Sequence, residues 1–194
     1  MNKMVISDQS LVCSYLSGNQ EAISTLIERH RRRVFDYINV MVKDRDLADD
    51  IFQETFIKAV RFIGEGRYSD NGKFLSWVLR IAHNQVIDYF RQKKGDRQVS
   101  ESEVGCDIVK IIRLTDTSIE ERIVAAQIDE DVRMLIELLP EEQKEVIYLR
   151  YFNNLRFKDI AELTNVSINT ALGRMRYALL NLRKLILEKN IQLS

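Results

Sequence analysis

The C-terminal part of the chain carries the pattern that most restricts its fold. Residues 138–184 read LLPEEQKEVIYLRYFNNLRFKDIAELTNVSINTALGRMRYALLNLRK. Pro140 with two acids after it is typical of a helix start, and a short helix is predicted around Ile160. Thr164-Asn165-Val166 predicts a tight turn, because asparagine adopts left-handed backbone at low cost. Ser167 is then an N-cap for a long helix to about residue 187, which completes a helix-turn-helix.

The second helix of this motif carries a polar face that is rich in donors. Acids are nearly absent from it until Glu188, whereas a surface without a partner usually mixes both signs. The second helix of a DNA-binding helix-turn-helix lies in the major groove, so the pattern favours duplex DNA binding. The alternative is a helical hairpin that binds nothing. The donors on this face are Asn169, Thr170, Arg174, Arg176, Tyr177, Arg183 and Lys184.

Charge and cysteine content exclude several classes of protein. The 194 residues carry 29 lysines and arginines and 29 aspartates and glutamates, so the chain does not coat nucleic acid by bulk charge. Cys13 and Cys106 lie far apart and only two histidines are present, which argues against a disulfide framework or a zinc site. With no membrane-length apolar run and no signal peptide, we expect a cytoplasmic protein with no metal, no cofactor and no membrane insertion.

Glycine, proline and periodicity indicate an all-α protein of two small helical domains. One proline and few strand-like alternations leave helical patterns over 8–16, 20–42, 46–63 and 74–94, with a loop at 64–73. The polar, acidic residues 96–121 read as a flexible linker with a short helix near 107–114, and helical periodicity resumes from about 123. We therefore predict domains at 1–95 and 122–194.

Helical spacing also predicts which side chains are buried. In the helix over 46–63 the predicted apolar stripe is Leu47, Ile51, Phe52, Phe56, Ile57 and Val60. In the helix over 74–94 it is Leu75, Val78, Leu79, Ala82, Val86 and Phe90. In the helix that starts at Pro140 it is Val146, Ile147, Leu149 and Tyr151.

Two surfaces of the first domain are candidates for function. The first is an acidic face, which is equally well explained by a favourable helix N-terminus and by docking of a basic partner; it comprises Asp49, Asp50, Gln53 and Glu54. The second combines an aromatic ring, an amide and cations, a set that suits unstacked bases and phosphates; it comprises Trp77, Arg80, Asn84, Asp88 and Arg91. The alternative for the second is a surface polar network with Trp77 in the core.

Three segments carry a resemblance to a known family. They read DLADDIFQETFIKAV, KFLSWVLRIAHNQVIDYFRQKK and LPEEQKEVIYLRYF…FKDIAELTNVSINTALGRMRYALLNLRK. In order and spacing they resemble the small two-domain sigma factors of bacterial RNA polymerase, the extracytoplasmic-function (ECF) type. The likeness spans nearly the whole chain apart from the linker. The segment NTALGRMRYALLNLRK is most similar to sigma factors of Bacteroidetes-type bacteria.

The resemblance implies a role for each surface. The first domain corresponds to sigma region 2, and its acidic face, Asp49, Asp50, Gln53 and Glu54, would dock core RNA polymerase. The loop 64–73 and the following helix would open the promoter −10 element and hold one strand, with Asn84 at the pocket for a flipped-out base. The residues implied there are Tyr68, Lys73, Trp77, Arg80, Asn84, Asp88 and Arg91.

The second domain corresponds to sigma region 4, whose second helix would read the −35 element in duplex form. Arg156 and Lys158 would contact phosphates. The groove-facing residues implied are Ser167, Asn169, Thr170, Gly173, Arg174, Arg176 and Tyr177. Leu172 and Gly173 stand where the family often has a basic residue and a serine, so the −35 sequence cannot be carried over. Gly173 suggests close approach of the backbone, either to DNA or to a neighbouring helix.

Three functions compete at this point. A sigma factor accounts for both domains and implies core polymerase and promoter DNA as partners; an anti-sigma factor is a further candidate partner, which the sequence neither shows nor excludes. An autonomous repressor or activator would use the helix-turn-helix alone and leave both surfaces of the first domain unexplained. An enzyme is not favoured, because the sequence lacks the usual parts of an active site: it has no phosphate loop, no clustered metal ligands and no catalytic nucleophile beside a base.

Overall fold

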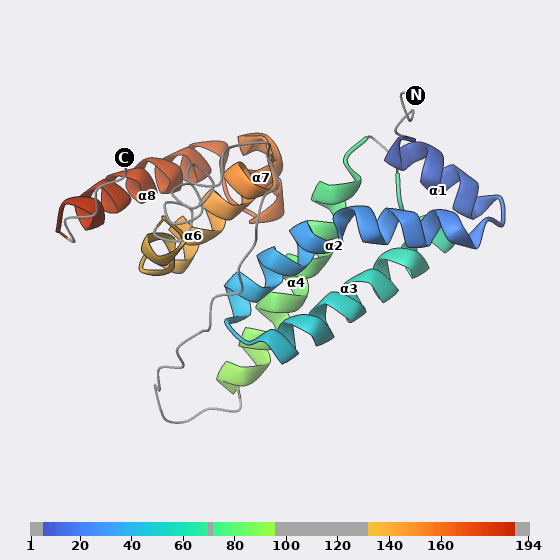
Figure 1. Ribbon diagram of the computed structural model, residues 1–194, viewed down its shortest axis with the longest axis horizontal. Coiled ribbons are helices and arrows are strands. Elements are labelled where there is room, and N and C mark those ends of the chain that lie inside the picture. The colour runs from blue at the N-terminus through green and yellow to red at the C-terminus, as the bar shows by residue number, and fades with distance from the viewer. Residues whose placement is uncertain (1–5, 70–71, 96–131, 189–194) are drawn as a thin grey trace, which may run out of the picture. The chain divides into compact units, whose positions relative to one another are not determined.

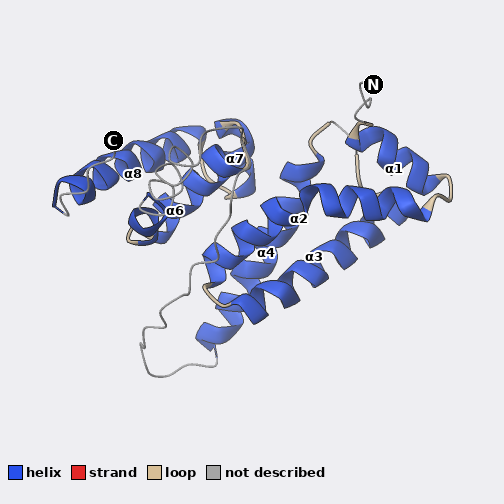
Figure 2. Cartoon of the chain, viewed as in Figure 1, coloured by secondary structure: helices blue, strands red, loops and turns tan. Residues whose placement is uncertain are grey.

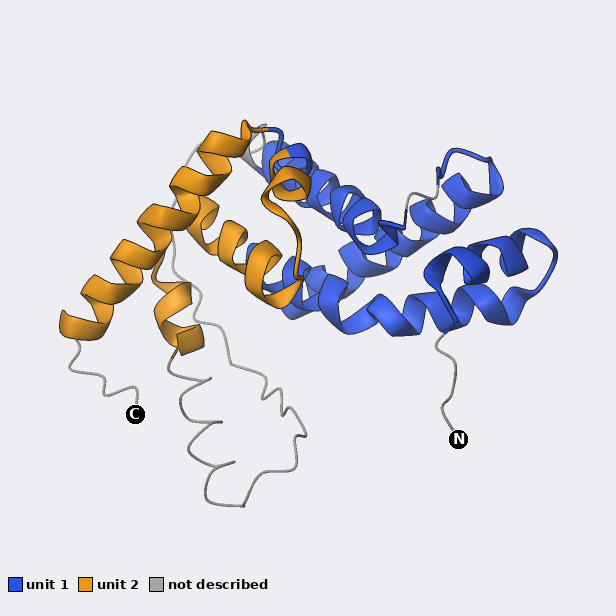
Figure 3. Cartoon of the chain, turned by 90° about the horizontal axis from the view of Figure 1, so that it is seen from above, with its two compact units in different colours: residues 1–104, 162–165 blue, residues 105–161, 166–194 orange. Residues whose placement is uncertain are grey.

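The structure is a computed structural model that describes residues 6–69, 72–95 and 132–188. Within these ranges the chain is helical and contains no strand (Figures 1 and 2), which confirms the predicted all-α class. Its contacts divide it into unit 1, residues 1–104 with 162–165, and unit 2, residues 105–161 with 166–194 (Figure 3). The linker predicted at 96–121, including the short helix at 107–114, lies outside the described residues.

The described residues of unit 1 include four helices that lie wholly within it, and local side-chain capping sets the start of the first three. The Ser7 hydroxyl accepts a hydrogen bond from Ser10 N at 3.1 Å, and the Asn19 and Asp44 side chains accept from Glu21 N and Leu47 N at 3.0 and 3.1 Å. Each cap satisfies a backbone N–H that lacks a partner in the first helical turn. The helices are α1 (Asp8–Leu16), α2 (Gln20–Val42), α3 (Arg45–Gly64) and α4 (Phe74–Gly95), within a residue or so of prediction.

The core of unit 1 lies where α2 packs against α1, α3 and α4. Removal of each large aliphatic side chain from water stabilises the fold by roughly 1.5–3 kcal/mol. The prediction that Ile57 belongs to this core is wrong, since 61% of it is exposed. The buried stripe of α3 instead passes through Thr55, whose hydroxyl accepts a 2.9 Å hydrogen bond from Gln85 of α4. The fully buried side chains include Leu26, Val34, Ile38, Ala48, Val78, Leu79, Ala82 and Val86.

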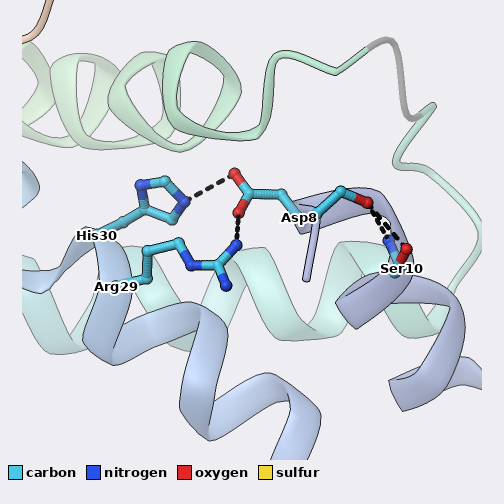
Figure 4. A network of polar contacts seen from close by, with 5 residues as sticks. Asp8, Ser10, Arg29 and His30 are labelled. Carbon is cyan, nitrogen blue, oxygen red and sulfur yellow. Dashed lines mark hydrogen bonds and ion pairs between the residues drawn. The ribbon is translucent and has the colours of Figure 1, made fainter. Parts of the chain in front are cut away.

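A polar network fastens α1 to α2 (Figure 4). The two carboxylate oxygens of Asp8 lie 2.6 Å from Arg29 Nη1 and 2.8 Å from His30 Nε2. The His30 ring is buried, and its Nδ1 has no hydrogen-bond partner among the described residues. Burial lowers the pKa of His30 below its ordinary 6.5, and the opposing effect of Asp8 is smaller.

Acid is expected to destabilise unit 1 through His30. Because the pKa of the folded state is lowered, the unfolded chain binds a proton first as the pH falls. The stability that His30 provides is therefore complete above pH 6.5 and is lost progressively below it, down to the lowered folded pKa. Urea midpoints measured from about pH 7.5 to about 5.5 should fall more steeply for the wild type than for His30→Gln. Equal slopes for the two proteins would contradict this assignment.

Unit 2 begins, among the described residues, with a helical turn at 132–137. The helix predicted from Pro140 to about residue 153 is interrupted, because its last turn is a π-helix in which Asn153 N donates to Tyr148 O at 3.0 Å. The wider turn places Tyr148 in the core and turns Tyr151 outward, 59% exposed, so the predicted burial of Tyr151 is wrong. The elements are α6 (Glu141–Ile147), η1 (Tyr148–Phe152), α7 (Phe157–Leu163) and α8 (Ile168–Glu188).

A buried lysine ties the turn at 132–137 to α6. The side chain of Lys144 is 0% exposed, and its Nζ lies 2.7 Å from Glu137 Oε2 and 3.7 Å from Glu141 Oε1. The lysine side chain is buried, whereas both carboxylates reach solvent, and apolar side chains make up the rest of the core of unit 2. They include Leu135, Ile136, Leu139, Val146, Leu149, Ile160, Ala171, Met175 and Ala178.

Two features are absent from the described part of the chain. None of its helices combines the length and the apolar character needed to cross a membrane. In the same residues, no three histidines, cysteines or acids lie close enough together to hold a metal ion. Cys13 is a free, exposed thiol, and Cys106 lies outside the described residues.

Candidate nucleic-acid interface

The acidic face is confined to one side of α3, near its N-terminus. Asp49, Asp50, Gln53 and Glu54 are all exposed, and Glu54 makes one long ion pair of 3.5 Å with Lys58. The residues that alternate with them, such as Ala48 and Phe56, are buried against the rest of unit 1. The face therefore presents carboxylates to solvent from a rigid helix.

An aromatic cluster lies where the loop after α3 meets the start of α4. The ring of Trp77 lies 4.5 Å from that of Tyr68 and 5.9 Å from that of Phe74, measured between centroids. Phe74 is 1% exposed and packs against the His30 ring at 5.3 Å, whereas Tyr68 and Trp77 are half-buried. The Trp77 side chain is thus neither fully buried nor fully exposed. The buried contact between Phe74 and His30 anchors the cluster.

A polar stripe continues from this cluster along α4. Arg80, Asn84, Asp88 and Arg91 are exposed at spacings of three and four residues, so they share one face of the helix. Asp88 accepts a hydrogen bond from Arg91 at 2.8 Å. Lys73 is half-buried just before α4, and its carbonyl oxygen accepts from Trp77 N at 3.0 Å. All the residues predicted for strand binding therefore lie on one helix or the loop before it.

The helix-turn-helix formed by α7 and α8 has the predicted turn. Asn165 adopts φ 54°, and the following Val166 N donates to Ala161 O at 3.0 Å. Ser167 caps α8, because its hydroxyl accepts from Thr170 N at 3.0 Å and lies 2.9 Å from the Thr170 hydroxyl. The small side chains of Ala161 and Ala171 are buried, which lets α7 and α8 approach closely.

The outward face of α8 is cationic. The helix carries Arg174, Arg176, Arg183 and Lys184 but a single acid, Glu188, which pairs with Lys184 at 3.7 Å. Asn169, Thr170, Arg176 and Tyr177 are exposed, and Arg174 is half-buried. The hydroxyls of Ser167 and Thr170 are engaged in the cap. The amide and the guanidinium groups are therefore the main polar groups available to a groove.

Two further cations lie at the start of α7. The Arg156 side chain is 69% exposed, and its Nε donates to the buried Asp159 carboxylate at 3.1 Å, which fixes its direction. Lys158 is exposed on the same turn. Both positions suit contact with a phosphate backbone beside α8.

Two residues of these surfaces were not predicted as site residues. Phe74 supports the aromatic cluster, and its spacing from Tyr68 and Trp77 was the only signal for it in the sequence. Leu172 is 44% exposed among the donors of α8. A Cβ built on Gly173 meets no atom within 4 Å among the described residues, so no neighbouring helix there explains that glycine.

Comparison with known proteins places both units in one family. Residues 26–95 match the family model for sigma-70 region 2, and residues 129–180 match that for sigma-70 region 4. Together the two matches cover more than half of the 194 residues. The chain belongs to the sigma-70 family. It is a sigma factor of the ECF type, which binds core RNA polymerase and directs it to promoters.

Relatives cover nearly the full length of this sigma factor. The ECF sigma factor SigW of Bacillus subtilis is 26% identical over 86% of this chain and 90% of its own length. The ECF sigma-E factor of Haemophilus influenzae is 29% identical over 88% of this chain and 90% of its own. An autonomous repressor is not favoured, because it leaves the region 2 match unexplained.

Solved structures share the fold. CnrH, determined in complex with the cytosolic domain of CnrY, superposes with a TM-score of 0.62 at 22% identity and covers 92% of this sigma factor and 96% of its own chain. The sigma factor RpoE of Bartonella quintana, determined with the anti-sigma factor NepR, gives 0.63 at 17% identity and covers 84% and 95% of the two chains.

Proposed function

We propose that the surfaces of this sigma factor divide the work of promoter recognition between the two units. The acidic face of α3 docks core polymerase, the aromatic cluster and polar stripe of unit 1 open and hold the −10 element, and the helix-turn-helix of unit 2 binds the −35 duplex. The observation that carries this proposal is the aromatic cluster beside an amide-and-cation stripe, since a duplex-binding repressor has no use for it. The domain limits proposed are 1–95 and 122–194, joined by the linker 96–121.

The aromatic cluster suits bases that have left the double helix. Base stacking on an aromatic side chain contributes about 1–3 kcal/mol, which offsets the cost of unstacking one base. Trp77 and Tyr68 keep part of each ring accessible while Phe74 holds them in place. Asn84, two turns along α4, carries both a donor and an acceptor for the edge of an extruded base.

The helix-turn-helix suits the closed duplex upstream. Arg156, Lys158 and the cations of α8 supply phosphate contacts, which fix the register of the module without reading sequence. Asn169 and Arg176 have side chains that form paired hydrogen bonds with adenine and guanine in the major groove. Sequence selectivity at the −35 element is therefore assigned to the first three turns of α8.

Reversal of charge on the acidic face is expected to weaken polymerase binding. The double variant Asp50→Lys, Glu54→Lys should lower affinity for core polymerase by about tenfold or more, because like charges then face a basic partner. Both side chains are exposed, so the fold of unit 1 should persist. Glu28→Lys, a single charge reversal at a side chain 74% exposed on α2, is the control and should bind normally. Affinity is measured by titrating labelled sigma factor with core polymerase. An equal loss of affinity in the Glu28→Lys control would refute the assignment of the acidic face as the docking surface.

In vitro transcription tests the function as a whole. Core polymerase from the source organism is incubated with supercoiled genomic DNA, with and without this protein, and 5′ ends are mapped. New start sites that share two upstream elements are expected, and they supply the −10 and −35 sequences. Tight duplex binding by the protein alone, with no new start sites and no association with polymerase, would overturn the proposal in favour of a repressor.

The cellular location, the source and a further partner of the protein are also proposed. A promoter-directing subunit acts in the cytoplasm, where the chromosome is, and performs no catalysis of its own. The amino-acid sequence of α8 supports an origin in a Bacteroidetes-type bacterium. The likeness to a sigma factor solved with an anti-sigma factor supports a masking partner of that class for this chain as well.

A further inference from the structure

One exposed stripe of α8 combines polar groups with an apolar centre. Asn169, Leu172, Gly173 and Arg176 follow one another at i, i+3, i+4 and i+7, so they share a single face of the helix. Asn169 and Arg176 are exposed. Between them lie a leucine, whose side chain cannot form a hydrogen bond, and a glycine, which has no side chain. The middle of the proposed reading face is therefore apolar.

Leu172 is not part of the buried core of unit 2. It is 44% exposed, whereas the opposite face of α8 provides the buried contacts through Ala171, Met175 and Ala178. Exposure of a leucine side chain forgoes the stabilisation that burial would give. Its position in the second turn of α8, among donors, points to a contact made outside this chain.

Gly173 makes a notch beside this leucine. Its φ is not in the left-handed region, and a Cβ at this position would meet no atom of the described residues within 4 Å. Neither backbone conformation nor packing therefore requires glycine, although glycine lowers helix stability relative to alanine. The absence of a side chain there shortens the distance at which a partner can approach the helix axis.

The chemistry of the major groove identifies that partner. Base edges present hydrogen-bonding groups there, and the 5-methyl group of thymine is the apolar feature that an aliphatic side chain can contact. The cations of α8 complement the phosphates of a duplex, and the amide of Asn169 and the guanidinium of Arg176 on the same face suit base edges. We propose that Leu172, with the notch at Gly173, reads the 5-methyl group of a thymine in the −35 element. This inference rests on the proposed −35 function of unit 2.

Uracil substitution tests the contact one methyl group at a time. With the −35 sequence known from mapped start sites, holoenzyme binds a series of promoters in which single thymines are replaced by uracil. Loss of one buried methyl group should weaken wild-type binding about three- to fourfold at one position. Leu172→Ala should bind the thymine promoter as weakly as the wild type binds the uracil promoter, and should not distinguish the two.

Leu180→Ala is the matched control, because Leu180 is 52% exposed on the same helix, two turns further on. It should keep the preference for thymine over uracil. If no uracil changes wild-type binding, or if Leu172→Ala keeps the preference, the inference is wrong. If the wild-type holoenzyme protects no −35 duplex at all, the proposed function of unit 2 fails instead, which separates the two outcomes.

Gly173→Ala provides a second, independent readout. The variant should melt at a higher temperature than the wild type, because alanine favours the helix and the space for its Cβ is open. Its affinity for the thymine promoter should nevertheless fall, since the added methyl group occupies the notch. A rise in stability with unchanged promoter affinity would contradict a close approach at this residue.

Discussion

Trp77→Ala is expected to slow promoter opening by about tenfold or more while leaving −35 binding unchanged. Stacking on one aromatic side chain contributes about 1–3 kcal/mol per base, which corresponds to roughly 5- to 150-fold. Trp77 presents part of its ring to solvent, and its other face packs on Tyr68 and Phe74. The variant should therefore form closed complexes that open slowly. Permanganate reactivity of unpaired thymines in the −10 region measures the opening rate.

The control for this prediction is Tyr89→Ala. Tyr89 is also a half-buried aromatic residue of α4, but it packs on Phe90 and lies away from the stripe that contains Asn84 and Arg91. Opening rates should be close to the wild type in this variant. Trp77→Phe should recover part of the rate, because phenylalanine still offers a stacking surface. Normal opening by Trp77→Ala would remove the aromatic cluster from the mechanism.

Lys144→Glu is expected to destabilise unit 2 by about 3–5 kcal/mol. The substitution places an unpaired carboxylate in a position that is 0% exposed, next to the Glu137 and Glu141 carboxylates that the lysine now neutralises. Such a cost is comparable with the whole stability of a small domain. The helix-turn-helix should therefore be lost at temperatures where the wild type is folded, and −35 protection with it.

Lys144→Met separates charge from packing. Methionine fills much of the same volume, and the Glu137 and Glu141 side chains are 37% and 51% exposed, so water can solvate them. We expect a cost below about 1.5 kcal/mol. Melting is followed by circular dichroism for the whole chain and by Trp77 emission for unit 1. A shift of Trp77 emission in Lys144→Glu, or equal destabilisation by both variants, would contradict this account.

The sequence predicted the elements that depend on local chemistry. Ser167 caps α8 through its own side chain, and Asn165 sets the turn between α7 and α8 by its own backbone preference. Such signals need no knowledge of the rest of the fold. For the same reason the acidic face of α3 and the donors of α8 could be identified from helical spacing alone.

What depends on tertiary packing could not be predicted. The π-turn that exposes Tyr151 follows from how residues 148–152 meet the core, because nothing in their local sequence requires a wider turn. The polar partner of the buried His30 ring is Asp8, which is distant in sequence. Phe74 becomes the support of the aromatic cluster only because α2 places His30 beneath it.

The Asp8 carboxylate ties α1 to the segment that the region 2 family model matches. The match to region 2 begins at residue 26, yet Arg29 and His30 within it are paired with a residue of α1 that lies before it. A fragment excised at the limits of family similarity would bury the His30 ring without its carboxylate and would leave Arg29 without this counter-charge. The Asp8 pairs therefore extend the stabilising contacts of this domain beyond the first residue of the region 2 match.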